Sequence, residues 1–367
     1  MQSVGVRQDL WEYLKGTDKT IVLYGMGNGA DKILAVCDAH KIPVCGVFAS
    51  DGFARGNLFH GMLVETWAEI RERYGAENII VLLAFGSARP EVLENIQRIS
   101  AESELYAPDV PVFGDGLFDS SYYMAHEAEL CQAEQLLSDE ESRNVFRNVI
   151  RYRLTGSPSF LYASESDPGK NLREIVCADR LRVAADLGAY HGETVRELID
   201  ACDGHLCKVY ALEPDPRNFR RLEAYAAEEM RAAVIPVCGA AWSEDGTLSF
   251  DGSGNRNASV AVNRSSVLQG AAPRWQVAAM TVDHVFADTS VDYIKYDVEG
   301  SEREALLGSA EVIRRDLPVL AISLYHRVED LFLLPLTVSR LFPAYRSYYL
   351  RRPRGIPAWD LMLYCKA

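Results

Sequence analysis

Acidic side chains follow three short apolar runs in the second half of this 367-residue chain. Asp186 comes after V-A-A, Glu213 ends K-V-Y-A-L-E, and Asp297 comes directly after Y-I-K-Y. Each run precedes a stretch with the apolar spacing of a helix, so the pattern predicts parallel strands that alternate with helices. Ligands in sheets of this kind bind beyond the carboxyl ends of the strands. We therefore expect the three carboxylates to share one binding site.

The turn after the first of these strands favours a nucleoside with a positively charged part. It reads D-L-G-A-Y-H-G-E-T, in which Gly188 and Gly192 let the backbone turn sharply and let a ligand approach the main chain. The spacing differs from the G-x-G-x-x-G pattern that holds a pyrophosphate, and a carboxylate at Asp186 would repel that group. The same carboxylate suits the ammonium and sulfonium groups of S-adenosylmethionine, and Glu213 can accept both ribose hydroxyls. A doubly wound domain with incidental loop acids is the alternative.

S-adenosylmethionine is thus the predicted cofactor, and a further apolar run extends its expected site. The run at 233–237 leads into G-A-A-W, where main-chain groups and an apolar side chain commonly flank an adenine in such folds. The expected cofactor contacts are Asp186, Gly188, Ala189, Gly192, Glu213, Ala241, Trp242 and Asp297.

Asp297 and Glu299 also stand where the methyl group of that cofactor would lie, which makes both candidates for catalysis. The run L-P-V-L-A-I-S-L-Y ends at His326, on the same expected sheet edge. A histidine near two acids at such a place is a candidate general base, and we predict His326 or Asp297 in that role, with Glu299 beside them. The alternatives are a structural histidine, capping of the next helix by Glu299, and a divalent cation such as magnesium held by Asp297, Glu299 and the substrate.

The composition is that of an ordinary globular protein with an acidic surplus. There are 38 Lys and Arg against 52 Asp and Glu, which gives a formal net charge of -14 and a pI near 5.1. This balance disfavours a surface that tracks nucleic-acid phosphates. The N-terminus lacks a basic segment followed by an apolar core, and the longest apolar runs are too short to cross a bilayer. We expect a cytoplasmic protein with neither a nucleic-acid nor a membrane partner.

A smaller α/β domain is predicted to precede the part that carries these acids. It begins with a strand at 20–24, followed by a turn with alternate glycines from Gly25 to Gly29, and its last strand is expected at 110–113. The turn lacks the dinucleotide spacing, so NAD is not expected. Over about the first hundred residues the domain resembles the N-terminal domain of bacterial sialic-acid-type sugar acetyltransferases. That resemblance implies a nucleotide sugar as a further ligand, and a docking domain that keeps the turn for backbone reasons is the alternative.

The expected boundaries give three parts. Residues 1–117 form the small Rossmann-like domain, residues 118–181 a helical linker or cap with one helix that begins at Ser138 as N-cap, and residues 182–367 the second domain. The last two strands of the chain are close enough in sequence to pair antiparallel. Asp245-Gly246 predicts a hairpin between A-A-W-S and T-L-S-F, outside the parallel sheet.

Four stretches taken in order identify the second domain as similar to a known family. D-L-G-A-Y-H-G-E-T, Y-A-L-E-P-D-P-R-N-F, I-K-Y-D-V-E-G-S-E and L-Y-H-R-V-E-D-L resemble the FkbM-type S-adenosylmethionine-dependent methyltransferases. The resemblance implies a class I methyltransferase fold, a Rossmann-like seven-stranded sheet whose last strand is antiparallel. It also implies O-methylation of a hydroxyl on a sugar, glycan or secondary metabolite. By this likeness Asp186, Gly188 and Glu213 carry the cofactor, and Asp297, Glu299 and His326 lie near the reacting centre. K-N-L-R-E-I-V departs from an aromatic-Pro segment that relatives often have at that place.

Two other classes of protein remain as alternatives. One is a non-catalytic protein that binds or senses a nucleotide sugar, and the other is a dehydrogenase that uses the first glycine turn. The expected partners of the enzyme are a small-molecule or glycan acceptor and, as a further expectation, a second copy of the chain.

Overall fold

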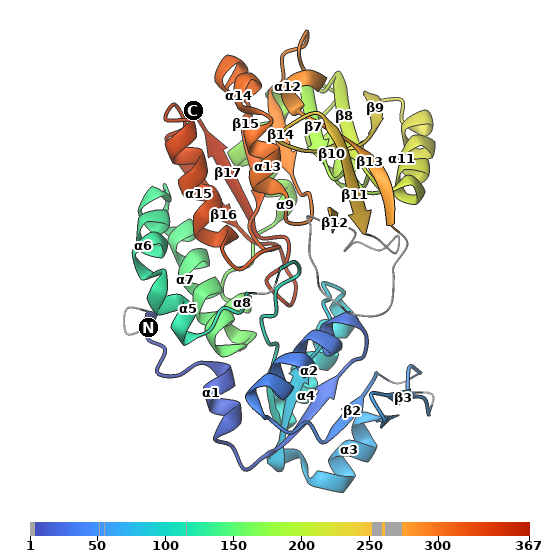
Figure 1. Cartoon of the computed structure of the whole chain (residues 1–367), viewed down its shortest axis with the longest axis vertical. Helices are drawn as coiled ribbons and strands as arrows, with labels where there is room; N and C mark the ends of the chain where they lie inside the picture. The colour runs from blue at the N-terminus through green and yellow to red at the C-terminus, as the bar shows by residue number, and fades with distance from the viewer. Residues whose placement is uncertain (1–3, 51, 55, 115, 252–258, 261–273) are drawn as a thin grey trace.

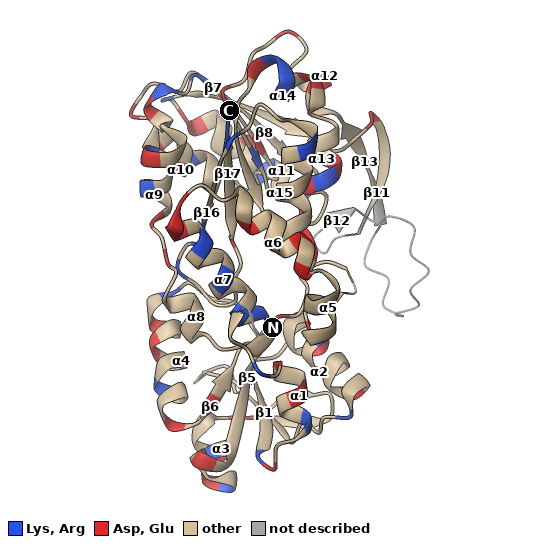
Figure 2. Cartoon of the chain, turned by 90° about the vertical axis from the view of Figure 1, so that its left-hand side faces the viewer, with Lys and Arg blue, Asp and Glu red and all other residues tan. Residues whose placement is uncertain are grey.

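The computed structural model describes residues 4–50, 52–54, 56–114, 116–251, 259–260 and 274–367. Of the three sheets in these residues, the two larger ones organise the fold, one in a smaller N-terminal unit and one in a larger C-terminal unit, with a group of helices between them in sequence (Figure 1). Figure 2 shows that Lys and Arg are interspersed with Asp and Glu over both units.

The N-terminal unit is built on a six-stranded sheet with the order β3-β4-β2-β1-β5-β6. Its strands are β1 (Thr20–Tyr24), β2 (Gly46–Phe48), β3 (Leu58–Phe59), β4 (Met62–Glu65), β5 (Ile79–Leu83) and β6 (Glu104–Tyr106). All neighbours pair in parallel apart from β3 and β4, which form a short antiparallel pair. Helices α1 (Leu10–Lys15) and α2 (Asn28–His40) pack on one face, and α3 (Trp67–Tyr74) and α4 (Pro90–Glu102) pack on the other. A 3-10 turn, Ala76–Asn78, leads into β5.

The last strand of this sheet, β6, comes earlier in the chain than the predicted strand at 110–113. Pro108 and Pro111 explain the difference, because a proline cannot donate a hydrogen bond to the ladder of a sheet. Residues 110–113 instead leave the sheet and cross to the C-terminal unit. There the Phe113 amide donates to the His326 carbonyl oxygen at 2.8 Å.

The C-terminal unit contains the predicted seven-stranded sheet, in the order β16-β17-β15-β14-β7-β8-β9. Its strands are β7 (Val183–Leu187), β8 (Lys208–Glu213), β9 (Ala233–Cys238), β14 (Tyr293–Tyr296), β15 (Val319–Ser323), β16 (Ser347–Arg351) and β17 (Met362–Lys366). The last strand, β17, inserts antiparallel between β15 and β16, and the strands from β9 to β15 are parallel. The expected fold class is therefore confirmed.

Helices cover both faces of this sheet. The short helical segments α9 (Pro168–Asn171), η3 (Leu172–Val176) and η4 (Ala178–Arg180), together with α10 (Glu193–Ala201) and α11 (Pro216–Glu228), lie over the face that presents Tyr293. The opposite face, which presents Ile294 and Tyr296, packs against α12 (Val282–Val285), α13 (Glu302–Leu307), α14 (Ala310–Asp316) and α15 (Asp330–Leu341). Alternate residues of one buried strand thus serve two separate core layers.

The predicted hairpin at Asp245-Gly246 is wrong. β10 (Ala240–Ala241) and β11 (Gly246–Asp251) do not pair with each other, because β13 (Arg274–Met280) lies between them in a four-stranded sheet completed by β12 (Ser259–Val260). Asp245 has a different task, since its carboxylate accepts the Thr281 amide at 2.7 Å and contacts His284.

The helices between the two sheets are α5 (Ser120–Ala125), α6 (Glu127–Leu136), α7 (Glu140–Thr155) and α8 (Ser159–Tyr162). The N-cap of α7 is Asp139 rather than the predicted Ser138, and its carboxylate accepts the Ser142 amide at 2.7 Å. Ser138 instead exchanges hydrogen bonds with the backbone of Tyr348 in β16. Within the described part of the chain, no helix has the length and apolar character needed to traverse a membrane.

Candidate active site

A cavity of about 410 Å³ lies at the carboxyl edge of the seven-stranded sheet. Residues that follow β7, β8 and β14 line it, and so does Ala88, which follows β5 of the N-terminal unit. The carboxyl ends of strands from both parallel sheets therefore face the same space. Of the residues predicted from the sequence, the cavity wall contains Asp186, Gly188, Ala189, Glu213, Ala241, Asp297 and Glu299.

Acidic side chains outnumber basic ones in the wall of this cavity. Among the described residues, seven carboxyl groups line it, against three basic side chains. Those acids are Asp186, Glu193, Glu197, Glu213, Asp297, Glu299 and Asp360, and the bases are Lys295, Arg351 and Arg354. Such a surplus of acidic groups favours a ligand with positive charge.

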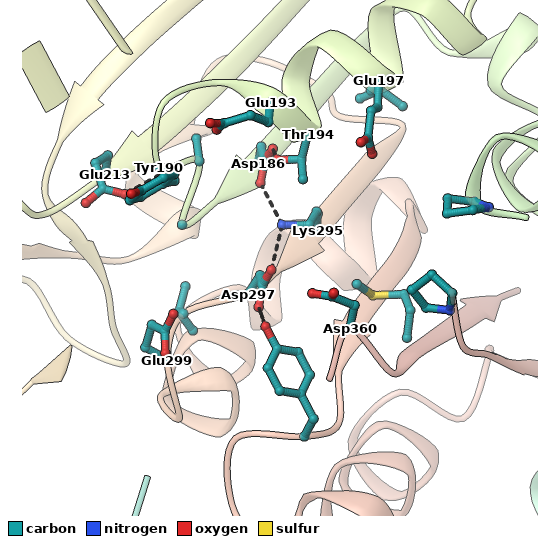
Figure 3. A pocket seen from close by; sticks show the side chains of 18 of the residues that line it. Asp186, Tyr190, Glu193, Thr194, Glu197, Glu213, Lys295, Asp297, Glu299 and Asp360 are labelled. Carbon is teal, nitrogen blue, oxygen red and sulfur yellow. Dashed lines mark hydrogen bonds and ion pairs between the residues drawn. The ribbon is translucent and has the colours of Figure 1, made fainter. Parts of the chain in front are cut away.

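Lys295 lies between Asp186 and Asp297 at the centre of the cavity (Figure 3). Its ammonium lies 3.3 Å from Asp186 Oδ1 and 3.1 Å from Asp297 Oδ2. Burial alone would lower the pKa of Lys295, but the two carboxylates outweigh it and raise that pKa. Burial also acts against the charge of Asp297, yet Lys295 and then His326 bring the pKa of Asp297 down to about 2. Asp297 is therefore held as an anion.

The remaining oxygens of these two acids are also engaged. The Thr194 hydroxyl donates to Asp186 Oδ2, and Asp297 Oδ1 accepts hydrogen bonds from the Ser323 hydroxyl at 2.9 Å and the Tyr325 hydroxyl at 3.0 Å. This network fixes both carboxylates, and it leaves few lone pairs of Asp297 for a metal ion. The nearby Lys295 ammonium further disfavours a divalent cation. Asp297, Glu302 and His326 are close enough to share an ion, but the hydrogen bonds and charges already satisfy Asp297.

Glu213 closes β8 inside a cradle of backbone amides. Its Oε2 accepts the Tyr190 amide at 3.0 Å and its Oε1 accepts the Asp215 amide at 2.9 Å. Burial raises the pKa of Glu213 to about 7. Each oxygen keeps a lone pair, so the carboxylate can still accept two hydroxyl groups of a ligand.

Gly188 is required by the close approach of two turns. Its φ is +85°, and a Cβ at this position would lie 1.9 Å from the Asp297 carbonyl oxygen. The turn after β7 therefore touches the turn after β14, which brings Asp186 and Asp297 together. Gly192 lies outside the cavity wall, as the left-handed N-cap of α10 against the Tyr225 ring.

The acidic turn, defined here as residues 297–302, presents Glu299 to the cavity. Glu299 has a φ of +53°, a conformation that few side chains adopt without support. Burial raises the pKa of Glu299 to about 8. The buried Glu302 supports the turn, because its Oε1 accepts the Val298 amide at 2.9 Å and the Gly300 amide at 3.4 Å.

His326 lies behind the acidic turn and not in the cavity wall, with an exposed fraction of 0%. Its Nδ1 is 2.9 Å from Glu302 Oε1, and its Nε2 is 3.5 Å from Glu299 Oε2 and 3.6 Å from Asp297 Oδ1. Neither ring nitrogen has the angles of a hydrogen bond, so the contacts are mainly electrostatic. Burial opposes protonation, but the acids, led by Glu302, raise the pKa of His326 to about 10.

Sequence reasoning missed Lys295 and Glu302, and the expected contact of Trp242 with the cofactor stays a prediction. Trp242 packs beside the small cluster of Ala240 and Val277, and it is absent from the cavity wall. A lysine inside the apolar strand Y-I-K-Y was a signal for a buried ion pair, because a buried ammonium needs an anionic partner. No comparable signal separated Glu302 from an ordinary residue of a first helical turn.

This arrangement defines a Rossmann-like methyltransferase fold with a nucleoside-sized acidic cavity, and comparison with known proteins agrees. Residues 186–346 match the family model described as "Methyltransferase FkbM domain". The structure of methyltransferase FkbM from Methylobacillus flagellatus KT is similar, with a TM-score of 0.69 and 19% identity over 97% of this chain and 92% of that one.

A further solved structure matches a smaller part of the chain. Fibrillarin from Aeropyrum pernix, in complex with natively bound S-adenosyl-L-methionine, has a TM-score of 0.34 and 15% identity over 53% of this chain and 70% of its own. Among curated proteins, no significant relative was found. The predicted FkbM likeness of the C-terminal part is thus confirmed. The likeness of residues 1–117 to sugar acetyltransferases stays a prediction.

Proposed function

We propose that the protein is an S-adenosylmethionine-dependent methyltransferase that acts on a hydroxyl of a sugar, glycan or secondary metabolite. The observation that carries this proposal is the pairing of Asp186 and Glu213 in one acidic cavity beside Asp297 and Glu299. The family match and the fold support methyl transfer. The proposal of a hydroxyl acceptor is supported by Glu299, a carboxyl group with a raised pKa at the same edge of the sheet.

The cavity residues fit the proposed cofactor. Glu213 keeps lone pairs for the two ribose hydroxyls, and Gly239–Ala241 supply backbone and small side chains at the end of β9 where an adenine would lie. One of the two charges of Asp186 and Asp297 is neutralised by Lys295, and the other remains to attract a cationic group. When bound, S-adenosylmethionine supplies an activated methyl group.

The chain's own task is then to orient an acceptor oxygen and take its proton. We assign Glu299 as the group that takes this proton, because it lines the cavity and the pKa of its carboxyl is raised to about 8, which makes it a stronger base than an ordinary carboxylate. Asp297 is a weaker base, because the pKa of its carboxyl is only about 2. His326 is protonated and buried, so its proposed part is to place a positive charge behind Glu299 and Asp297.

Calorimetry with S-adenosylmethionine and S-adenosylhomocysteine tests the cofactor assignment. Asp186→Asn and Glu213→Gln should each weaken binding by about tenfold or more, since each removes a charged partner of a hydrogen bond. Asp200→Asn, at an exposed acid paired with Arg231 outside the cavity, should leave binding unchanged. Equal binding by all four proteins would contradict the assignment.

Incubation with deuterated-methyl S-adenosylmethionine and a panel of hydroxyl-bearing compounds tests turnover. A mass increase on an acceptor, with release of S-adenosylhomocysteine, is the expected result. Binding of the cofactor without turnover on any acceptor would favour the sensing protein. If the rate is retained in the presence of a chelator, the alternative mechanism with a divalent cation is contradicted. Binding of NADH in a fluorescence titration would instead favour a dehydrogenase.

A further inference from the structure

We propose that the N-terminal unit completes the methyl-transfer site through a strap, residues 109–114, in which Phe113 acts with Lys32 to position the acidic turn. The strap leaves the N-terminal sheet after β6 and lies against the turns that follow β14 and β15. The expected effect on the position of Glu299 rests on the contacts alone, whereas the expected effect on the rate rests on the proposed function.

Lys32 ties the strap to helix α2. Its ammonium donates to the Pro111 carbonyl oxygen at 2.8 Å and to the Val112 carbonyl oxygen at 2.7 Å. Burial lowers the pKa of Lys32, and the negative charge of Glu299 opposes that shift, so the lysine lies within electrostatic reach of the acidic turn. One side chain of the N-terminal unit therefore holds the strap and lies within electrostatic reach of the proposed base.

Phe113 ties the strap to the C-terminal unit. Its amide donates to the His326 carbonyl oxygen at 2.8 Å. Its ring lies so close to Gly300 that a Cβ on that glycine would be 2.9 Å from a ring atom. The guanidinium carbon of Arg327 is 4.4 Å from the ring centroid, and Arg327 Nε donates to the Gly300 carbonyl oxygen at 2.6 Å. Phe113 thus contacts both the acidic turn and the residues that follow β15.

The acidic turn needs such support, because Glu299 occupies the left-handed region of backbone space. Glu302 holds the Val298 and Gly300 amides from within the C-terminal unit, and the strap adds contacts from the other unit. A turn held from two units keeps the Glu299 carboxyl in one place, and a general base acts only in a narrow geometry.

Hydrogen exchange at the Val298 and Gly300 amides tests the strap in the full-length protein. Lys32→Met removes both hydrogen bonds to the strap, and it should speed exchange at these amides by about tenfold. Lys32→Arg, which keeps the charge and the donors, should restore slow exchange. Lys19→Met is the matched control. Lys19 belongs to the same unit, and its ammonium lies 2.8 Å from Glu104 Oε1, outside the cavity wall.

Methyl transfer separates positioning from a general loss of structure. Lys32→Met and Phe113→Leu should lower kcat by about tenfold while the affinity for S-adenosylmethionine stays within about twofold, since neither residue lines the cavity. Slow exchange at the two amides in both variants would overturn the proposal, whatever the rate. If the wild-type protein does not bind S-adenosylmethionine, the proposed function fails, and the exchange experiment still decides whether the strap holds the turn.

Discussion

At the scale of single residues, Glu299 combines the position and the proton affinity of a general base. It lines the cavity, and burial raises the pKa of its carboxyl to about 8. Because the deprotonated form accepts the proton, kcat/KM should rise with pH through about 8. Glu299→Gln should lower kcat by about a hundredfold or more and abolish this dependence. The dependence of kcat/KM on pH in both proteins measures this effect. If kcat/KM of Glu299→Gln still rises through about pH 8, another group takes the proton.

The same shift affects stability, with the opposite trend. The folded state holds the Glu299 proton between the ordinary pKa of 4.5 and about 8, whereas the unfolded state has released it. Because the folded state then binds more protons, the contribution of Glu299 to the free energy of unfolding falls as pH rises across that window. Activity and stability at this residue therefore respond to pH in opposite directions.

Lys295 is the residue on which the centre of the site depends for stability. The Lys295 ammonium lies 3.3 Å from Asp186 and 3.1 Å from Asp297. Lys295→Met would leave these two carboxylates close together without their shared cation. Loss of one partner from a buried ion pair costs about 3–5 kcal/mol, so urea unfolding should reveal a decrease of that size. Lys19→Met breaks a more exposed pair and should cost at most about 1 kcal/mol. Equal values for the two variants would contradict a buried role for Lys295.

The acids that close strands could be predicted from the sequence, because a carboxylate directly after an apolar run has a fixed place at a sheet edge. The side chain of Glu213 and that of Asp297 both lie in the cavity as expected. Whether a side chain at that edge points into the cavity or into the core could not be predicted in the same way. His326 follows a strand too, yet its ring turns inward to Glu302, a contact that depends on tertiary packing.

At the scale of elements, long periodic segments were predictable and local pairing was not. The turn at Asp245-Gly246 has hairpin chemistry, but β13 inserts beside β11 and takes the hydrogen bonds that β10 was expected to provide. Competition from a distant strand leaves no trace in the turn sequence. The α7 cap has a similar cause, since Ser138 bonds to β16 and Asp139 caps instead.

The contact between the turns after β7 and β14 gives an element-scale prediction. Gly188→Ala would place a Cβ 1.9 Å from the Asp297 carbonyl oxygen, so the two turns must separate. We expect a loss of at least about 2 kcal/mol in stability, together with loss of cofactor binding. Gly204→Ala is the control, because φ is +79° there and no atom of the described residues lies within 4 Å of the added Cβ. It should cost only about 1 kcal/mol and leave binding unchanged, as urea unfolding and calorimetry would measure.

At the scale of the whole molecule, the two sheets share a continuous core. One cluster of buried side chains includes Val22 and Val81 of the first sheet and Ile294 and Ile322 of the second, and Phe146 of α7 belongs to the same cluster. The sequence predicted two α/β units but gave no sign of how they meet. The contacts between them, such as Gly86 against the Trp359 ring, join residues far apart in the chain.

Because the core is continuous, the two units should unfold together. Trp67 is buried in the N-terminal unit and Trp242 lies in the C-terminal unit. Proteins that keep one of the two, with phenylalanine in place of the other tryptophans so that position 359 still carries a ring, report on each unit separately. Both probes should give the same urea midpoint, and a saturating cofactor should shift both midpoints equally, since binding stabilises the native state as a whole. Gly86→Leu, which would push a side chain into the Trp359 ring, should separate the transitions. Two midpoints in the wild-type protein would show instead that the interface is too weak to couple the units.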